Sequence, residues 1–372
     1  MDKKIRLGVI GAGIMGMGHI NNILSGKCPK LEVVAVCDVL SERLALAKES
    51  LPAAALFESA DAMLASGLID AALVATPHYA HPELAIACME RGIHVMVEKP
   101  AGVYTKQVQA MNAAADKSGV VFGIMFNQRT DHIYRKMKEL ISGGSLGEIR
   151  RVSWLITDWY RPQAYYDSGA WRATWSGEGG GVLLNQCPHN LDLLQWICGL
   201  PVKVDAKLHF GKWHDIEVED DVSAYLEFEN GATGIFITST ADTPGSNRFE
   251  ITLDGGKLLA EGGQLKLWRL KESEPAFSAR NKELFAAPAF TETVVETDGE
   301  SGQHIVVMNA FADAILCGGA LVADGVEGIR GLTLSNALHL SAFLGRPVEI
   351  PFDEDLYFAE LSKRIETSRG RG

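Results

Sequence analysis

The sequence predicts an α/β chain in two parts: a doubly wound parallel sheet, then an α+β region with a large, mostly antiparallel open sheet. Two observations carry this prediction. Up to residue 127, short apolar runs alternate with helical stretches, which is the pattern of a parallel sheet covered by helices. After residue 127 the strands are longer and are joined by short turns with hairpin signals, such as residues 229–231 and 254–256. We therefore expect one domain at residues 1–127 and a second at residues 128–372.

Composition narrows the class of protein. The chain has 372 residues, of which 47% are hydrophobic, and it can therefore bury two cores. A formal net charge of −12 disfavours a nucleic-acid surface, which needs a concentrated basic patch. No apolar run reaches the roughly 18 residues that span a bilayer, and the start of the chain has no signal-peptide pattern. These features predict a cytoplasmic protein with a small polar ligand and no membrane or nucleic-acid partner.

The six cysteines are scattered and include no Cys-x-x-Cys pair. Neither a disulfide framework nor a zinc site is indicated, and no metal is expected.

A glycine motif follows the first apolar run. Gly11, Gly13 and Gly16 are spaced as G-x-G-x-x-G and lead into a helix that runs to about residue 24. In this setting the glycines permit a tight turn, close approach to a pyrophosphate, and close packing of helix on strand. The helix that begins near Ile14 and Met15 offers its amide groups to the phosphates. The pattern predicts a dinucleotide-binding domain of the Rossmann type.

Asp38 ends the second strand, 22 residues after Gly16, where such domains place an acid on the adenosine ribose. A carboxylate repels a 2′-phosphate, and the next residues, Val39 and Leu40, include no arginine to bind one. NAD is therefore predicted in preference to NADP.

Polar residues also follow the later strands of this domain. Thr76, Pro77 and His78 come after the fourth strand, with His81 close behind, and Asn127 ends the sixth. The carboxyl ends of parallel strands meet at the ligand edge of the sheet, so these residues are predicted to line the cofactor. Thr76 and His78 could equally cap the next helix.

The fifth strand, near residues 95–98, ends in Glu98, Lys99 and Pro100. At the ligand edge, Glu98 and Lys99 would reach the cofactor, and Lys99 the substrate as well. An isolated Glu-Lys-Pro is more often a solvated strand end, and only its context favours the functional interpretation.

Helices and strands are also expected in the second half of the chain. One sheet face should be covered by helices, and the other could pair with a second copy of the chain. Residues 271–291 are predicted to form a loop. The expected strands are 149–157, 202–210, 222–228, 233–240, 248–253 and 257–261, and the expected helices are 131–142, 305–317 and 325–343.

A glycine triplet at residues 179–181 precedes the most polar helix of this half. The glycines would let the backbone pass close to a ligand. The helix that follows is predicted to place Asn185 and His189 one turn apart on one face, with Asp192 three residues further. A lone histidine on a helix is usually structural. If Lys99 also reaches the substrate, both side chains could contact the same hydroxyl.

Taken together, four segments resemble the Gfo/Idh/MocA family, named for glucose-fructose oxidoreductase and inositol dehydrogenase. The resemblance covers nearly the whole chain in order, and the segments are residues 11–16, 76–81, 92–100 and 179–192. It implies that Lys99 is the catalytic lysine and that Asn185 and His189 occupy the positions of the family's second catalytic motif.

Asn185 departs from the aspartate that the family commonly has at this position. Because an amide cannot act as a base, the expected proton-handling pair is Lys99 and His189, with Asn185 orienting the substrate. Trp171 and Arg172 resemble a substrate-binding segment, in which an arginine bonds to sugar hydroxyls and an aromatic ring packs on a pyranose. The alternative is a core tryptophan and a surface ion pair.

The resemblance thus implies an NAD-dependent oxidoreductase that oxidises a secondary hydroxyl of a sugar, glycoside or cyclitol, with the 3-hydroxyl of a pyranoside as the narrower expectation. A homodimer or homotetramer through the sheet of the second domain is expected. Two alternatives remain open: an enzyme that cleaves glycosides with tightly held NAD and no net redox change, and a non-catalytic sensor of NAD or sugar.

Overall fold

The computed structural model describes residues 4–370, which form two compact units. The first unit contains residues 4–130 and 302–332, and the second contains the rest of the described chain. The sequence-based boundary had assigned the returning segment 302–332 to the second part. Its helix α10 (Gln303–Cys317) instead buries Val307, Met308 and Phe311 in the core of the first unit.

A six-stranded parallel sheet forms the centre of the first unit, in the order β3-β2-β1-β4-β5-β6. The order reverses between β1 and β4, and such a switch point opens a ligand crevice at the carboxyl ends of the strands. The predicted doubly wound sheet is confirmed. Its strands are β1 (Ile5–Ile10), β2 (Leu31–Cys37), β3 (Ala55–Phe57), β4 (Ala71–Val74), β5 (His94–Val97) and β6 (Phe122–Ile124).

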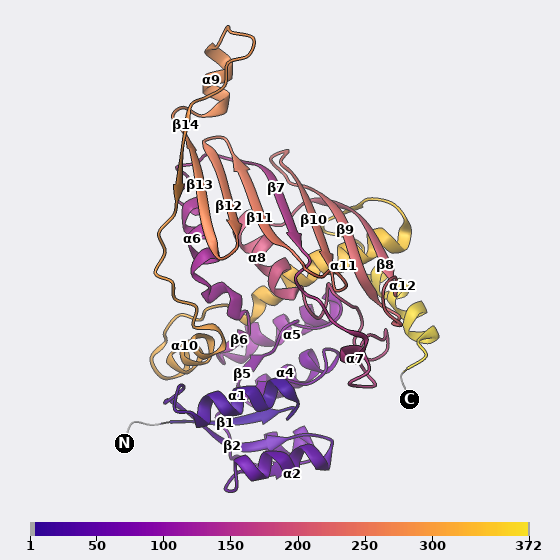
Figure 1. Cartoon of the computed structure of the whole chain (residues 1–372). Coiled ribbons are helices and arrows are strands. Elements are labelled where there is room, and N and C mark those ends of the chain that lie inside the picture. Colours follow the sequence, from indigo (N-terminus) through magenta and orange to yellow (C-terminus); the bar gives the residue numbers. More distant parts are fainter. Residues whose placement is uncertain (1–3, 371–372) are drawn as a thin grey trace. The chain divides into compact units, whose positions relative to one another are not determined.

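Helices alternate with these strands, as the sequence pattern predicted (Figure 1). They are α1 (Ile14–Leu24), α2 (Ser41–Ser50), α3 (Ala60–Ala65), α4 (Ala80–Glu90) and α5 (Thr105–Ser118), with the short 3₁₀ turns η1 (Asn127–Thr130) and η2 (Gly325–Glu327).

A nine-stranded sheet forms the centre of the second unit, in the order β14-β13-β12-β11-β7-β10-β9-β8-β15. Only the pair of β7 and β10 is parallel, so the expected mostly antiparallel sheet is confirmed. Its strands are β7 (Ile149–Ile156), β8 (Lys203–Phe210), β9 (Glu219–Glu227), β10 (Thr233–Ser239), β11 (Asn247–Leu253), β12 (Gly256–Glu261), β13 (Gln264–Leu270), β14 (Phe290–Val294) and β15 (Val348–Glu349).

Helices lie on one face of this sheet (Figure 1). Tyr134 of α6 packs against Trp154 of β7, and Ser341 of α11 accepts a hydrogen bond from the backbone of Ala206 on β8. The helices of this unit are α6 (His132–Ser142), α7 (Gln163–Tyr166), α8 (Pro188–Cys198), α9 (Glu274–Arg280), α12 (Glu354–Thr367) and, from residue 333 on, α11 (Gly328–Leu344). None of the helices within residues 4–370 is long and apolar enough to cross a membrane.

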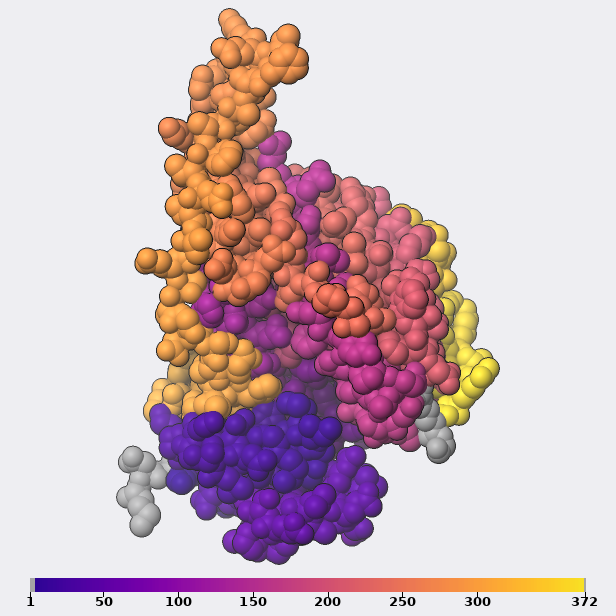
Figure 2. Space-filling view, in the orientation of Figure 1, coloured from indigo at the N-terminus to yellow at the C-terminus, as the bar shows by residue number. Residues whose placement is uncertain are grey.

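The sequence analysis was wrong about the segment that follows β12. It missed β13 altogether and predicted a loop at residues 271–291, which contains α9 and the start of β14. β14 extends the sheet by pairing with β13, and this pairing cannot be inferred from local pattern. The segment projects beyond the sheet (Figures 1 and 2). Phe285, which belongs to it, is 97% exposed.

Candidate active site

Two glycines shape the loop between β1 and α1. Gly11 has a φ of +97°, and a Cβ on it would lie 2.6 Å from the carbonyl oxygen of Ala75. A Cβ on Gly16 would lie 1.9 Å from the carbonyl oxygen of Gly11, so only glycine fits at either position. Gly13 is the N-cap residue of α1 and provides no side-chain cap. The first amides of α1 therefore have no side-chain cap and suit a phosphate.

The Asp38 carboxylate is buried beside this loop. Its Oδ2 accepts a hydrogen bond from the backbone of Ala12 at 2.8 Å, and its Oδ1 accepts one from the backbone of Leu40 at 3.0 Å. Arg43 Nη1, on the first turn of α2, lies 3.5 Å from Asp38 Oδ2. Arg43 was not predicted, because only Val39 and Leu40, the two residues directly after Asp38, were considered. Its side chain, from the first turn of α2, nevertheless reaches the carboxylate.

Exposed apolar side chains flank this carboxylate. Ile14 is 80% exposed and Val39, which directly follows the buried Asp38, is 82% exposed. A dinucleotide needs an anion site for its pyrophosphate, an acceptor for its ribose hydroxyls and apolar surface for its adenine. The α1 N-terminus, Asp38 and these two side chains supply those three features, so the residues present fit NAD.

Two buried polar atoms at the carboxyl edge of the sheet have no hydrogen-bond partner among the described residues. Thr76 Oγ1, after β4, and Asn127 Oδ1, after β6, are buried without a hydrogen-bond partner among residues 4–370. Asn127 Nδ2 donates to Gln303. Buried polar atoms are nearly always paired in folded proteins, so these two atoms also fit a polar ligand. Tyr79, not Thr76 or His78, is the N-cap residue of α4, which removes the capping alternative.

His81 joins the two loops that follow β4 and β5. Its Nε2 lies 2.7 Å from the carbonyl oxygen of Thr76, and its Nδ1 lies 2.8 Å from that of Pro100. Burial lowers the pKa of His81, and a neutral ring has one N–H, so it donates to one of these oxygens at a time. These contacts of His81 hold the edge of the sheet together, and its predicted contact with the cofactor stays a prediction.

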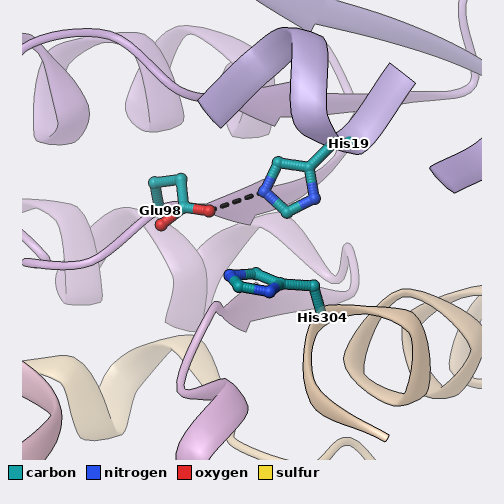
Figure 3. A group of neighbouring side chains, drawn as sticks. All are labelled: His19, Glu98 and His304. Carbon is teal, nitrogen blue, oxygen red and sulfur yellow. Dashed lines mark hydrogen bonds and ion pairs between the residues drawn. The ribbon is translucent and has the colours of Figure 1, made fainter. Parts of the chain in front are cut away.

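Glu98 is a buried carboxylate bonded to a histidine that the sequence analysis overlooked. His19 Nε2, on α1, lies 2.6 Å from Glu98 Oε1 (Figure 3). Burial acts to raise the pKa of Glu98, but the hydrogen bond with His19 and the charges of His19 and Lys99 outweigh it and lower the pKa to about 2. Glu98 Oε2 accepts a hydrogen bond from the backbone of Lys99 at 3.1 Å. The carboxylate thus fixes the backbone that carries the predicted catalytic lysine.

His304 of α10 adds a second ring to this pair (Figure 3). It meets the His19 ring edge to face, with the centroids 5.3 Å apart, and burial lowers its pKa. Nitrogen and oxygen atoms of the three side chains lie within 4.8 Å of one another, and such groups can bind metals. The contacts that the structure shows among them are the hydrogen bond between His19 and Glu98 and the packing of the two rings. We therefore interpret the cluster as a hydrogen-bonded support for Lys99.

In the second unit, close packing accounts for glycine at one position of the triplet. A Cβ on Gly181 would lie 2.0 Å from the carbonyl oxygen of Glu219. The Glu219 carboxylate also accepts hydrogen bonds from the backbone of Gly181 and Leu183, each at 2.9 Å, and it pairs with His339 at 3.0 Å. Close packing on β9 therefore requires glycine at 181, and the expectation that the triplet passes a ligand is not needed to explain it.

The predicted common helical face of Asn185 and His189 is wrong. α8 begins at Pro188, so His189 lies in its first turn while Asn185 lies in the turn before it. Proline favours the first position of a helix, and it ends the possibility of a continuous helix from residue 182. His189 and Asp192 are both buried on α8. Asn185 is positioned by contacts from other segments.

Arg172 is held between two aromatic rings. Its guanidinium carbon lies 4.7 Å from the centre of the Trp171 ring and 4.6 Å from that of Tyr165. Its Nη1 donates to the Tyr165 hydroxyl at 2.9 Å, and this hydroxyl donates to Asn185 Oδ1 at 3.3 Å. Trp171 and Arg172 are half-buried. A core tryptophan with an arginine in a surface ion pair does not describe this arrangement.

A second buried carboxylate, Glu178, closes this cluster and was not singled out from the sequence. It is 2% exposed and accepts a hydrogen bond from the amide of Asn185. Burial raises the pKa of Glu178 to about 7, although hydrogen bonds from Ala173 and Asn185 and the charge of Arg172 act against the rise. No sequence signal distinguishes it, because it stands beside glycines in an irregular segment.

A dinucleotide-binding sheet with a lysine at its ligand edge, together with a second unit that carries a polar cluster around Arg172 and a buried histidine on α8, is typical of NAD-dependent dehydrogenases that act on CH–OH groups. Comparisons with known proteins agree. Residues 5–126 match the model of an oxidoreductase family with an NAD-binding Rossmann fold, and residues 134–259 match the GFO/IDH/MocA C-terminal domain. The chain belongs to the GFO/IDH/MocA family and is an NAD-binding oxidoreductase.

Two curated relatives show how the similarity is distributed. A 1-carboxy-3-chloro-3,4-dihydroxycyclohexa-1,5-diene dehydrogenase of Comamonas testosteroni is 30% identical over 61% of this chain, and the match spans 56% of that protein. The D-glucoside 3-dehydrogenase of Escherichia coli is 27% identical over 94% of this chain and 98% of the relative.

A solved structure is similar along nearly the whole chain. The WlbA dehydrogenase of Chromobacterium violaceum, in complex with NADH and UDP-GlcNAcA, has a TM-score of 0.81 and 29% identity. The match covers 95% of this chain and 98% of that protein.

Proposed function

We propose that this enzyme oxidises a secondary hydroxyl of a sugar, glycoside or cyclitol to a ketone, with NAD as the oxidant. The observation that supports the proposal is the Arg172 cluster of the second unit. In it the Arg172 guanidinium, the Tyr165 phenol and the Asn185 amide are joined by hydrogen bonds. Such groups bind several hydroxyls at once, and the half-buried Trp171 offers a surface for a sugar ring.

Two residues are proposed to handle the proton. Lys99, which follows Glu98 at the ligand edge of the first unit, and His189, on α8 of the second, supply the hydrogen bond and the base that a leaving hydroxyl proton needs. Arg172, Trp171 and Asn185 bind and orient the substrate. When bound, NAD would supply the hydride acceptor, and the alcohol would lose one hydrogen as hydride and one as a proton, a two-electron oxidation to the ketone.

The narrower substrate is a pyranoside oxidised at its 3-hydroxyl. This choice is supported by the name and whole-length match of the D-glucoside 3-dehydrogenase, and by the sugar nucleotide in the complex of the WlbA dehydrogenase. The test is NADH absorbance from purified enzyme with NAD and a panel of glucosides, free sugars and inositols. Absence of turnover on the whole panel would reject the proposal, and cleavage of an aryl glycoside without added NAD would replace it with a redox-neutral reaction.

The roles of the two proton-handling residues can be tested directly. Lys99→Met and His189→Ala should each lower kcat by about 100-fold or more, the usual loss for an acid–base group. Lys117→Met and His209→Ala, which alter exposed residues of the same types, are the matched controls and should keep wild-type turnover. A Lys99 variant that retains more than about a tenth of the activity, far above the scale of a lost acid–base group, would contradict the assignment.

We also propose that the protein is a cytoplasmic homodimer or homotetramer joined through the open face of the nine-stranded sheet. On that face Ile235 and Tyr225 lie opposite each other in register and are 45% and 44% exposed. Light scattering gives the mass of the assembly, and Ile235→Glu should reduce it because a charge cannot be buried there without a partner. The six described cysteines are all free thiols, which suits a reducing compartment.

A further inference from the structure

The buried Glu178 carboxylate connects two segments that carry proposed substrate-binding residues. Its Oε2 accepts a hydrogen bond from the backbone of Ala173 at 2.6 Å, directly after Arg172. Its Oε1 accepts one from the side-chain amide of Asn185. One carboxylate thus sets the position of the Arg172 backbone and of the Asn185 side chain at the same time.

The turn at Ala173 depends on the hydrogen bond from its backbone amide to Glu178. Ala173 is fully buried and has a φ of +53°, a left-handed conformation that disfavours residues with a Cβ. The surrounding structure must compensate for it. Its amide is held by Glu178, and its carbonyl oxygen accepts a hydrogen bond from the backbone of Glu217 at 3.1 Å. Without the carboxylate, the amide would lose its buried acceptor, and the direction of Arg172 would no longer be fixed.

Each hydrogen bond in this cluster has a fixed direction. A guanidinium only donates and a carboxylate only accepts. Arg172 therefore donates to the Tyr165 hydroxyl, the hydroxyl donates to Asn185 Oδ1, and Asn185 Nδ2 donates to Glu178. The charged group at each end of the chain determines the orientation of the two neutral groups between them. If Glu178 is replaced by glutamine, the amide can both donate and accept, and the direction of the hydrogen bonds between it and Arg172 is no longer fixed.

We propose that Glu178 is a positioning residue of the dehydrogenase, because it orients Asn185 and the Arg172 turn for the hydroxyls of the substrate. The inference rests on the proposed function, and it extends that function to a residue that does not itself touch the substrate. In its ionised form, which predominates only above its raised pKa of about 7, Glu178 supplies the anion of a carboxylate–amide pair in which Asn185 supplies the amide. The pair should therefore work equally well with its two members exchanged.

The exchange is the test. Glu178→Gln leaves two amides, and one donor then faces another. Asn185→Asp leaves two carboxylates in contact in a buried place. The double variant Glu178→Gln/Asn185→Asp restores the hydrogen bonds described above. In it the new amide at position 178 accepts from Ala173 and donates to the new carboxylate at position 185, and that carboxylate still accepts from Tyr165.

We expect each single variant to lower kcat/KM about 10- to 100-fold, the scale of a lost hydrogen bond to a charged group. The loss should lie mainly in a raised KM for the sugar, with the Kd for NADH unchanged by fluorescence titration. The double variant should recover to within about 5-fold of wild type, since no hydrogen bond is then missing. Glu227→Gln is the control for the loss of one negative charge and should change nothing, because this side chain is 43% exposed and pairs only with Lys203 among the ion pairs of the described residues.

Additive losses in the double variant, or a Glu178→Gln enzyme with wild-type kcat/KM, would overturn the inference while leaving the proposed function intact. Thermal unfolding of the four proteins separates folding defects from positioning, since a merely structural role would lower Tm without raising KM in the proteins that remain folded. If wild type turns over no polyol at all, the proposed function fails, and the positioning role for that reaction fails with it. The Tm values of the same four proteins then still show whether residues 178 and 185 are coupled.

Discussion

Glu98 and Glu178 are two carboxylates with nearly equal burial, 4% and 2% exposed, and opposite pKa shifts. The pKa of Glu98 is lowered to about 2, whereas that of Glu178 is raised to about 7. Burial disfavours the charged form of both. Glu98 is bonded to the His19 ring and lies near the Lys99 cation. Glu178 accepts its hydrogen bonds from the neutral amides of Ala173 and Asn185, and the charge of Arg172, which favours its ionised form, is opposed by a second anion, Glu219. The charge of the partners, not the depth of burial, therefore decides the ionisation of a buried acid.

Removing His19, the hydrogen-bond partner of Glu98, is the strongest test of this comparison. His19→Ala leaves the Glu98 carboxylate buried without its hydrogen-bond partner, and we expect a loss of about 3–5 kcal/mol in the free energy of unfolding, as for other broken buried pairs. The matched control is His209→Ala. His209 pairs with Asp221 at 2.9 Å, but its side chain is 52% exposed, so its loss should be within about 0.5 kcal/mol. Urea unfolding at pH 7 measures both, and equal losses would contradict the comparison.

The two carboxylates should also give opposite dependences of stability on pH. Because the folded-state pKa of Glu178 is raised from 4.5 to about 7, its penalty is absent below pH 4.5, develops as the pH rises, and is complete above pH 7. Because that of Glu98 is lowered from 4.5 to about 2, its contribution is complete above pH 4.5 and is lost as the pH falls towards 2. Each shift corresponds to about 3 kcal/mol.

The measurement is the free energy of unfolding of wild type, Glu98→Gln and Glu178→Gln between pH 3 and pH 8. Relative to Glu178→Gln, wild type should lose stability as the pH rises. Relative to Glu98→Gln, it should gain stability over the lower part of this range. Parallel curves for all three proteins would show that neither carboxylate titrates differently in the folded state.

A smaller effect is expected at another buried carboxylate, Asp38, which we propose binds the ribose of the cofactor. Asp38→Ala should weaken NAD binding by about 1–3 kcal/mol, the scale of hydrogen bonds to a charged group. NADP should bind no worse, because Arg43 loses its partner and can pair with a 2′-phosphate. Adding Val39→Arg should shift the preference further towards NADP.

The matched control for this prediction is Asp38→Ala/Arg43→Ala, in which any gain for NADP should disappear. Dissociation constants of both cofactors from fluorescence titration decide the matter. A wild-type enzyme that prefers NADP would overturn the assignment of Asp38.

Much of the first unit could be predicted because its signals are local. The G-x-G-x-x-G spacing, the acid at 38 and the lysine at 99 each stand directly at the end of a strand, and parallel strands bring such ends to one edge whatever the rest of the chain does. The period of apolar residues alone therefore placed these groups on the ligand edge of one sheet. In the second unit a local signal was misleading, because the helix predicted to carry Asn185 begins only at Pro188.

The sequence by itself thus determined the alternating strands and helices, the NAD motif and the place of Lys99 after the fifth strand, because each of these depends on local sequence. Only the tertiary structure decided that α10 returns to the first unit and brings His304 to Glu98, that Arg43 covers Asp38, and that Glu178 holds Asn185. These contacts depend on strand pairing, on helix packing and on the left-handed turn at Ala173. Their physical consequence is that the pKa values of Glu98 and Glu178, two similarly buried acids, are shifted in opposite directions. The neighbours that cause these shifts cannot be found from spacing in the chain.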